Sequence, residues 1–180
     1  MWKTLNSKKI FEHSRLTLIE DDIQLPNGTK SKYLLFEDKG DCVTIICRNE
    51  EGKINLQKEF SYPIRKSLYQ FPGGFVPCGE NIEDGANREL MEELGYKSNK
   101  LTQIGKYLMN NRRSKSFMYV FLAEDLEVAD LKGNRDATEE DLLNHWVQEN
   151  IIDKKIKSGE IIHVHVLASW GFYKNLKIEY

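Results

Sequence analysis

The chain has 180 residues, 40% of them hydrophobic, which suits one domain or one domain with a small appendage. With a formal net charge of −2, the chain lacks the basic excess of nucleic-acid-binding proteins, and no apolar run approaches the length of a membrane span. Neither nucleic acid binding nor membrane insertion is therefore expected. The first residues lack the apolar core of a secretory signal, and the odd number of cysteines, three, favours free thiols in a reducing cytoplasm.

The first part of the chain, residues 1–37, is predicted to form strands. Apolar and polar residues alternate along residues 16–25, and the turn signal Pro26-Asn27-Gly28 follows. A polar break at residues 38–41 ends this region. We therefore expect two units, a small N-terminal β subdomain over residues 1–40 and a main domain over residues 41–180.

The main domain opens with an apolar run from Cys42 to Arg48, which predicts a buried strand. Asn49-Glu50-Glu51-Gly52 turns the chain, so residues 53–60 are expected to return as the hairpin partner of this strand. Further along, Phe71-Pro72-Gly73-Gly74 is a tight glycine-rich segment. Such a segment lets the backbone pass close to another group and presents carbonyl oxygens as ligands.

A helix is predicted to follow Asn81, which is a good N-cap residue. Glu83 and Asp84 would lie in its first turn, where negative charge faces the positive end of the helix dipole. Gly95 fits the position after the last turn, where the backbone becomes left-handed. The sequence therefore predicts both ends of this helix.

Three carboxylates share one face of the predicted helix. At about 100° per residue, they fall on an arc of about 100°, and an apolar arc lies beside them. The acidic arc holds Glu89, Glu92 and Glu93, and the apolar arc holds Ala86, Leu90 and Leu94. Clustered carboxylates repel one another unless a cation lies among them, and oxygen ligands without His or Cys suit Mg²⁺ or Mn²⁺. A solvated acidic face is the alternative, but the spacing back to Gly74 and Glu80 favours a metal site.

The remainder of the chain interleaves strands with few helices, which suggests a mixed sheet between helical layers. The predicted elements are strands at 103–108, 117–123 and 142–147, polar loops at 110–115 and 125–141, and helices at 149–157 and 161–176. His163 and His165 stand two apart on the last helix, so they are expected to face different ways and to hold no metal.

The segment 74–96 resembles the signature of the Nudix hydrolases, G-x5-E-x7-R-E-U-x-E-E-x-G-U, in which U is aliphatic. The matching residues are Gly74, Glu80, Arg88, Glu89, Leu90, Glu92, Glu93 and Gly95, and only the last position differs, being Tyr96. The resemblance implies an α+β fold, an α/β/α sandwich with a mixed central sheet. It also implies that Glu92 and Glu93 hold Mg²⁺ (or Mn²⁺) most directly. Further support is expected from Glu89, Glu80 and a carbonyl of Gly73 or Gly74, while Arg88 pairs with a carboxylate.

Outside this segment the chain is similar to the ADP-ribose pyrophosphatase branch of that superfamily. The similarity rests on a long strand-rich start with Trp2, on Phe121–Leu126, on His145-Trp146-Val147 and on Ser158–Ile161. It implies Mg²⁺-dependent hydrolysis of a nucleoside diphosphate sugar such as ADP-ribose to a nucleoside monophosphate and a sugar phosphate. It also implies a homodimer formed through the N-terminal strands, with Trp2 stacking on the base.

By the same resemblance, the general base is a glutamate on the loop before the last strand. Glu140 is the first candidate and Glu139 the second, because the family pattern places an acidic residue near Thr138, which cannot act as a carboxylate base. The diphosphate would be gripped by cations, since guanidinium forks match phosphate oxygens. The candidates are Arg112, Arg113 and Lys115 in the polar loop, and Arg65, which would replace an arginine where this chain has Ser61.

Two other functions remain open from the sequence. The first is a house-cleaning pyrophosphohydrolase of nucleoside triphosphates, which the long strand-rich N-terminus disfavours. The second is a nucleotide-sugar sensor without turnover, which the nearly intact signature disfavours.

Overall fold

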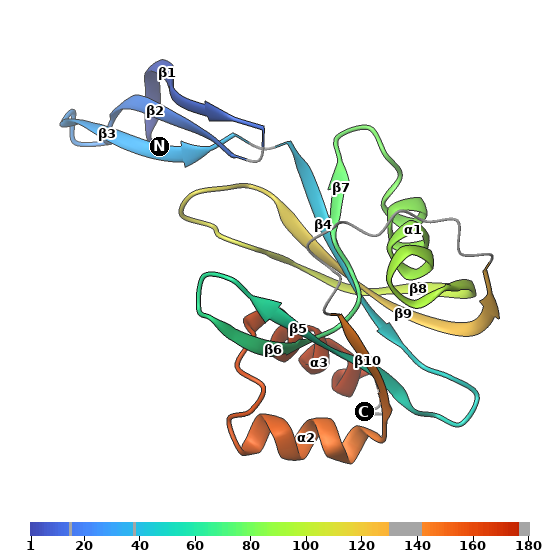
Figure 1. Ribbon diagram of the computed structural model, residues 1–180. Coiled ribbons are helices and arrows are strands. Elements are labelled where there is room, and N and C mark those ends of the chain that lie inside the picture. Colours follow the sequence, from blue (N-terminus) through green and yellow to red (C-terminus); the bar gives the residue numbers. More distant parts are fainter. Residues whose placement is uncertain (15, 38, 130–141, 177–180) are drawn as a thin grey trace.

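The computed structural model of the protein describes residues 1–14, 16–37, 39–129 and 142–176. Strands dominate this part of the chain (Figure 1). In chain order its elements are β1 (Lys3–His13), β2 (Leu16–Gln24), β3 (Lys30–Phe36), β4 (Gly40–Cys47), β5 (Ile54–Ser61), β6 (Lys66–Gln70), β7 (Phe75–Pro77), α1 (Ile82–Leu94), β8 (Tyr96–Leu108), β9 (Phe117–Val128), β10 (Leu143–Val147), α2 (Glu149–Lys157) and α3 (Val164–Asn175).

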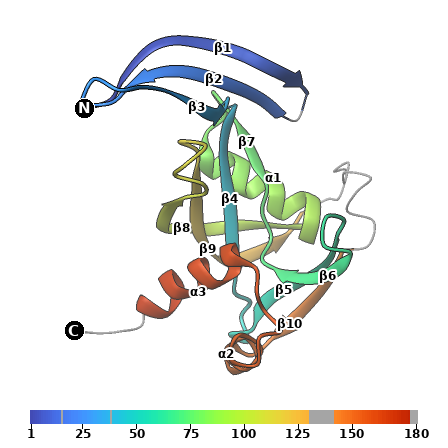
Figure 2. The same ribbon diagram turned by 90° about the vertical axis from the view of Figure 1, so that its left-hand side faces the viewer.

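The described strands form three sheets. The central sheet has the order β7-β4-β9-β8 and is mixed, because β4 runs parallel to β9 while β7 and β8 are antiparallel to their neighbours. A second, antiparallel sheet has the order β10-β5-β6. The third sheet, β1-β2-β3, stands apart from the rest at the N-terminal end (Figures 1 and 2). Whether it is a separate subdomain ending at residue 40 stays a prediction.

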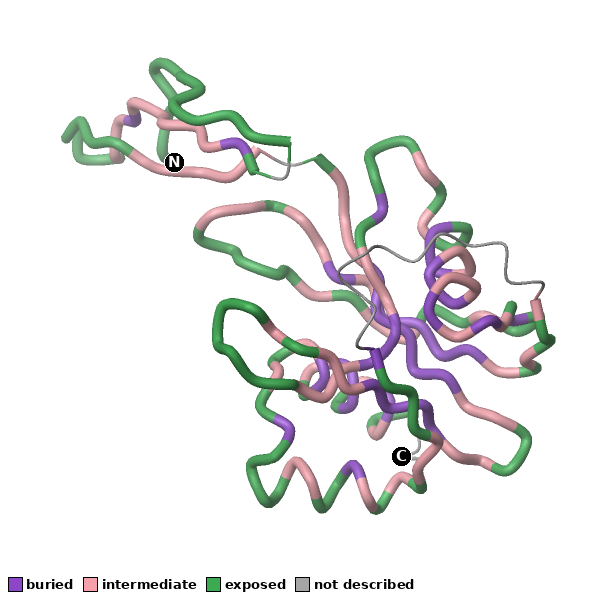
Figure 3. The backbone as a smooth tube through the Cα atoms, viewed as in Figure 1, coloured by how far each residue is buried: buried purple, intermediate pink, exposed green. Residues whose placement is uncertain are grey.

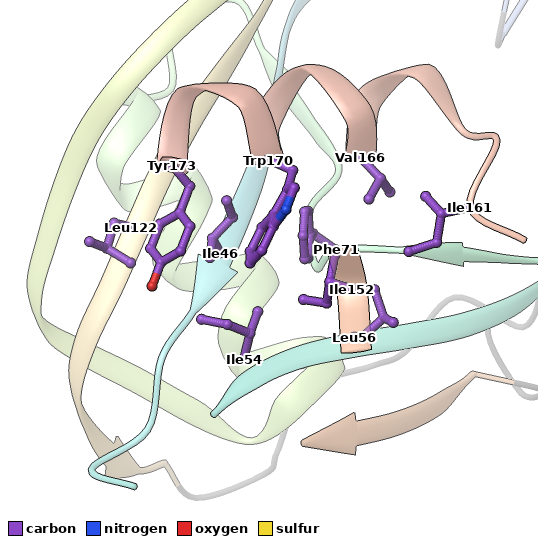
Figure 4. Packing of buried hydrophobic residues seen from close by; sticks show 10 residues of the cluster. All are labelled: Ile46, Ile54, Leu56, Phe71, Leu122, Ile152, Ile161, Val166, Trp170 and Tyr173. Carbon is purple, nitrogen blue, oxygen red and sulfur yellow. The ribbon is translucent and has the colours of Figure 1, made fainter. Parts of the chain in front are cut away.

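Within the central sheet, β4 is buried on both faces, and its alternating side chains enter two different core clusters. Ile45 and Cys47 pack with Ala86 and Leu90 of α1. Ile46 faces the opposite way, into a cluster that joins β5, β9, α2 and α3 (Figure 4). The expected α+β sandwich, a mixed sheet between helical layers, is therefore confirmed.

Burial is uneven along the chain. Purple, buried stretches concentrate in β4, β9 and the helices that cover them, whereas β1 is exposed along its whole length (Figure 3). In the residues that are described, no helix has both the length and the apolar character needed to span a membrane.

Some expected elements differ from the structure. The hairpin predicted for residues 42–60 is wrong: β4 and β5 meet only at the bridge Arg48–Ile54, and β5 then joins another sheet. Both edges of β4 are already occupied, by β7 and β9. The polar loop expected from residue 125 is strand up to Val128, because pairing with β8 extends β9. The last helix begins at Val164 rather than at residue 161.

A close approach between β8 and α3 depends on Gly105. Gly105 follows an irregularity in the β8–β9 register, and a Cβ placed on it would lie 2.4 Å from the Phe172 ring of α3. Tyr107, two residues along β8, stacks on the same ring. Helix and strand can therefore approach this closely only because residue 105 has no side chain.

We expect Gly105→Ala to lower the free energy of unfolding by about 1–3 kcal/mol, because the added methyl overpacks the contact with Phe172. Gly171→Ala is the matched control, since that glycine lies in α3 with open space around its Cβ position. It should raise stability by about 0.5–1 kcal/mol through helix propensity. Urea unfolding of both variants measures this, and equal stability of the two would contradict the packing argument.

Candidate active site

The helix α1 has the ends that the sequence predicts. The Asn81 side chain accepts hydrogen bonds from the backbone N–H groups of Glu83 (2.8 Å) and Asp84 (3.2 Å). Gly95 has φ = 74°, in the left-handed region, and closes the last turn. These caps set where α1 begins and ends, and the packing of Ala86 and Leu90 against the central sheet sets the direction in which its carboxylates lie.

The Gly73–Gly74 segment lies between β4 and α1. Its backbone is tied to β4, since Val43 N–H donates to the Gly74 carbonyl at 2.9 Å. Gly73 has φ = 147°, and a Cβ there would lie 2.1 Å from the Val43 carbonyl oxygen. A Cβ on Gly74 would lie 2.6 Å from a carboxylate oxygen of Glu89. Only glycines therefore allow the backbone to pass between the strand and this carboxylate.

Arg88 connects three of the acidic residues. Its guanidinium donates to Glu80 at 3.1 and 3.3 Å, to Glu89 at 2.7 Å and to Glu92 at 3.2 Å. It also donates to the Phe75 carbonyl at 3.0 Å, which ties α1 to β7. The hydrogen bond to Glu80, followed by the one to Glu89, raises the pKa of Arg88 above its usual value, so the guanidinium stays charged.

Two of the predicted metal ligands are buried. Glu89 is 7% exposed and Glu93 is 3% exposed, whereas the Glu92 side chain is 29% exposed. The Glu93 carboxylate accepts a hydrogen bond from Gln57 Nε2 at 2.6 Å and faces the Gly73 N–H at 3.4 Å. Burying carboxylates is costly unless donors or cations compensate them, so this face of α1 is built around negative charge.

The chemistry of these groups fits a hard divalent cation. Three carboxylates, those of Glu80, Glu89 and Glu92, contact the Arg88 guanidinium, and the buried Glu93 carboxylate is held by Gln57, so the available ligands are all oxygen. Within the described part of the chain, however, no three His, Cys, Asp or Glu side chains converge in a metal-holding geometry. Glu89 and Glu92 each accept a hydrogen bond from Arg88 through one carboxylate oxygen, and a carboxylate has a second oxygen with which it can bind a cation.

The proposed general bases cannot be placed. The described residues do not include Glu139, Glu140 or Thr138, the position at which the chain differs from the family pattern. The chain that follows them returns close to the carboxylates, because Asn144 Nδ2 donates to the Glu93 carbonyl at 3.2 Å.

Two of the predicted substrate contacts lie on aromatic neighbours. Trp2 is 57% exposed and meets Tyr33 edge to face, with ring centroids 5.9 Å apart. Arg65, in the turn between β5 and β6, lies over the Tyr62 ring at 3.6 Å. Nothing in the structure tests their predicted role.

The loop between β8 and β9 is attached to the N-terminal sheet. Arg113 donates to the Leu34 carbonyl at 3.1 Å, and Tyr33 donates to the Arg112 carbonyl at 2.8 Å. Arg112, Arg113 and Lys115 line a hollow of about 470 Å³ between this loop and the sheet. Contact of these three side chains with a diphosphate stays a prediction.

A separate cavity of about 580 Å³ lies between β3, the β8–β9 loop and the start of α3, and His165 lines it. The expectation that His163 and His165 face different ways is wrong, since their rings meet edge to face with centroids 5.0 Å apart. His163 is the N-cap of α3 and has extended backbone, so helical spacing does not apply. Burial lowers the pKa of both imidazoles.

Sequence reasoning missed Gln57 and Asn144 as neighbours of Glu93. Gln57 alternates with the apolar residues of β5, a pattern that predicts an exposed side chain, whereas the structure buries both Gln57 and Asn55 completely. No sequence signal marks Asn144, because its contact depends on how β10 pairs with β5.

Comparisons with known proteins show the family and the fold that this chain shares. The NUDIX domain model matches residues 38–168. The ADP-ribose pyrophosphatase of Bacillus subtilis (strain 168) is 35% identical over 137 residues, 76% of this chain and 74% of that protein. The ADP compounds hydrolase NudE of Escherichia coli (strain K12) is 27% identical over 132 residues, 73% of this chain and 71% of that protein.

One solved structure, the crystal structure of an ADP compounds hydrolase, superposes with a TM-score of 0.85 at 21% sequence identity. It covers 97% of this chain and 93% of that chain, which shows a shared fold over nearly the whole molecule.

Arg88→Gln should lower the free energy of unfolding in metal-free buffer by about 1–3 kcal/mol, because Glu80, Glu89 and Glu92 lose their shared cation. Added Mg²⁺ should raise the melting temperature of this variant more than that of the wild type, since the ion takes over the compensation. Thermal melts with and without Mg²⁺ measure both effects. Lys97→Gln is the control, because it removes one positive charge from an exposed position. It should change neither the free energy of unfolding nor the response of the melting temperature to Mg²⁺. An equal response to Mg²⁺ in the wild type and both variants would refute the argument.

The partly buried thiol of Cys42 predicts a loss of stability at high pH. Burial raises the pKa of Cys42 from 9.0 to about 11. Between these values the unfolded chain has lost the proton and the folded chain has kept it, so the free energy of unfolding falls as pH rises. Urea unfolding measures the free energy of unfolding between pH 8.5 and 11. Its fall over this range should be smaller by about 1–3 kcal/mol in Cys42→Ala than in the wild type. Cys78→Ala, which removes an exposed thiol, is the control, and its free energy of unfolding should fall with pH as steeply as that of the wild type. An equally steep fall in Cys42→Ala would contradict the prediction.

Proposed function

This chain belongs to the NUDIX family and is a Nudix hydrolase; from this premise we propose that it hydrolyses the diphosphate linkage of a nucleoside diphosphate sugar such as ADP-ribose, with Mg²⁺ as cofactor. The products are a nucleoside monophosphate and a sugar phosphate. The observation that carries the proposal is the face of α1, where Glu89 and Glu93 are buried beside the Gly73–Gly74 segment and Glu92 lies next to them.

The proposed metal ligands are Glu89, Glu92 and Glu93, with Glu80 and a carbonyl of the Gly73–Gly74 segment in support. When bound, Mg²⁺ supplies charge screening for the diphosphate and activation of the attacking water. Mn²⁺ suits the same oxygen donors. Arg88 holds three of the carboxylates on one side of the helix, so it keeps the donor set together before the ion arrives.

The proton of the attacking water needs a base, for which we propose Glu140 and, as second candidate, Glu139. The tie between Asn144 and the Glu93 carbonyl supports this choice, because the chain emerges from their loop beside the carboxylates. A carboxylate there would take the proton as the P–O bond forms.

The proposed substrate class is based on the relatives, which are an ADP-ribose pyrophosphatase and an ADP compounds hydrolase. Arg112, Arg113, Lys115 and Arg65 remain the proposed phosphate contacts, and Trp2 the proposed base contact. We further propose a homodimer formed by the N-terminal sheet. Its strand β1 exposes apolar side chains, with Leu5 and Phe11 each at 50% and Ile10 at 44%, and an exposed strand of this kind favours pairing with another chain.

The substrate is tested by incubating the protein and Mg²⁺ with ADP-ribose, GDP-mannose, UDP-glucose and dGTP, followed by chromatography. We expect AMP and ribose 5-phosphate from ADP-ribose. Turnover of dGTP alone would favour a triphosphate hydrolase, and tight binding without any product would favour a sensor; either result would contradict the proposal.

Glu92→Gln should lower kcat by roughly 10²–10³-fold, several kcal/mol of activation free energy, because it removes a proposed metal ligand. The melting temperature in metal-free buffer should not fall, since the change also removes repulsion among carboxylates. Glu83→Gln is the control, an exposed acid in the first turn of the same helix, and should retain wild-type kcat. Unchanged kcat in Glu92→Gln would remove the proposed mechanism.

A further inference from the structure

Two buried amides stand out on β5. Asn55 and Gln57 are each 0% exposed, and they alternate with Ile54 and Leu56, which belong to the hydrophobic core. Three of their polar atoms, Asn55 Nδ2, Asn55 Oδ1 and Gln57 Oε1, have no hydrogen-bond partner. A buried polar atom without a partner costs about as much as a lost hydrogen bond, so an apolar side chain would suit this strand better.

Gln57 differs from Asn55 in one contact. Its Nε2 donates to the Glu93 carboxylate at 2.6 Å, a buried hydrogen bond between segments 36 residues apart. A carboxylate can only accept, so the nitrogen must face Glu93 and the Oε1 atom is the one left without a partner. The orientation of the amide is thus decided by Glu93.

The second sheet holds the last turn of α1 at two points. Gln57 of β5 pairs with Asn144 of β10 in the strand register. Gln57 donates to the Glu93 side chain, and Asn144 donates to the Glu93 backbone carbonyl. This pair of strands therefore contacts Glu93 at both its carboxylate and its backbone, and the Gly73 N–H faces the same carboxylate oxygen as Gln57.

The donor to Glu93 is neutral, unlike the guanidinium that meets Glu89 and Glu92. A cation at this place would compensate the carboxylate charge and compete with a metal ion. An amide orients the carboxylate without itself neutralising the carboxylate charge. This is the arrangement that a ligand of a divalent cation needs before the cation binds.

We propose that Gln57 is a positioning residue that orients the Glu93 carboxylate for the divalent cation. The inference rests on the proposed function only in taking Glu93 as a metal ligand. Gln57 touches neither substrate nor the reacting atoms in this role and acts through Glu93. Removing a hydrogen-bonding partner of a metal ligand typically weakens metal affinity by roughly 10–100-fold.

The test is titration of metal-free protein with Mn²⁺, read by the loss of the free Mn²⁺ signal in electron paramagnetic resonance. Gln57→Met retains the side-chain volume and removes the amide, and we expect its Mn²⁺ dissociation constant to rise by roughly 10-fold or more. Gln57→Asn retracts the amide by one carbon and should weaken Mn²⁺ binding in the same direction. This second variant, with melting temperatures of all proteins, guards against a Gln57→Met chain that does not fold.

Asn55→Leu is the matched control, because it removes an equally buried amide from the same strand without a bond to Glu93. It should bind Mn²⁺ like the wild type. Mn²⁺ affinity that is unchanged in both Gln57 variants, or lost equally in Asn55→Leu, would overturn the inference. A wild type that binds no Mn²⁺ would overturn it as well.

Turnover separates the inference from the proposed function. At low Mn²⁺ the Gln57 variants should hydrolyse ADP-ribose more slowly, and saturating Mn²⁺ should restore kcat to within about 2-fold of wild type, which a general structural defect would not allow. Slow turnover that saturating Mn²⁺ does not restore counts against the positioning role. If no nucleoside diphosphate sugar is turned over by the wild type, the proposed function fails, and the Mn²⁺ titration still decides the role of Gln57.

Discussion

The burial of Glu89 and Glu93 against the Gly73–Gly74 segment is the contact on which the rest of the site depends. Carboxylates are rarely buried, because each loses its hydration and repels its neighbours. The structure compensates them with Arg88 on one side and Gln57 on the other. The two glycines are part of the same constraint, since a side chain at either position would strike the Glu89 carboxylate or the backbone of β4.

The buried carboxylates of α1 are contacted by both of the sheets in the main part of the chain. The central sheet carries the glycine segment through the bond between Val43 and Gly74, and it packs against the apolar side of α1. The second sheet reaches the end of the helix through Gln57 and Asn144. The acidic face therefore lies where α1, the central sheet and the second sheet meet. The two sheets supply the glycine segment on one side of the carboxylates and hydrogen-bond donors on the other. A helix with the same sequence but without these neighbours would present only a solvated stripe of charge.

The N-terminal sheet is connected to the remainder through the β8–β9 loop rather than through a shared core. Hydrogen bonds from Arg113 and Tyr33 fasten the loop to β3. The Arg113 guanidinium, a proposed diphosphate contact, thus also holds two parts of the chain together. Side chains with three or more donors serve both purposes readily, since one N–H can hold a backbone carbonyl while others remain for a ligand.

The sequence by itself determined α1, its caps and the face that gathers Glu89, Glu92 and Glu93, because helical geometry converts spacing into direction over a few residues. The fold class and the family also followed, since the signature between Gly74 and Gly95 is local. Only the tertiary structure decided that β5 leaves β4 for another sheet and that Gln57 lies beside Glu93. It also decided that His163 and His165 meet, because His163 caps α3 instead of belonging to it. Such contacts depend on which strand edges are free and on where a helix begins, and short-range spacing carries no information about either.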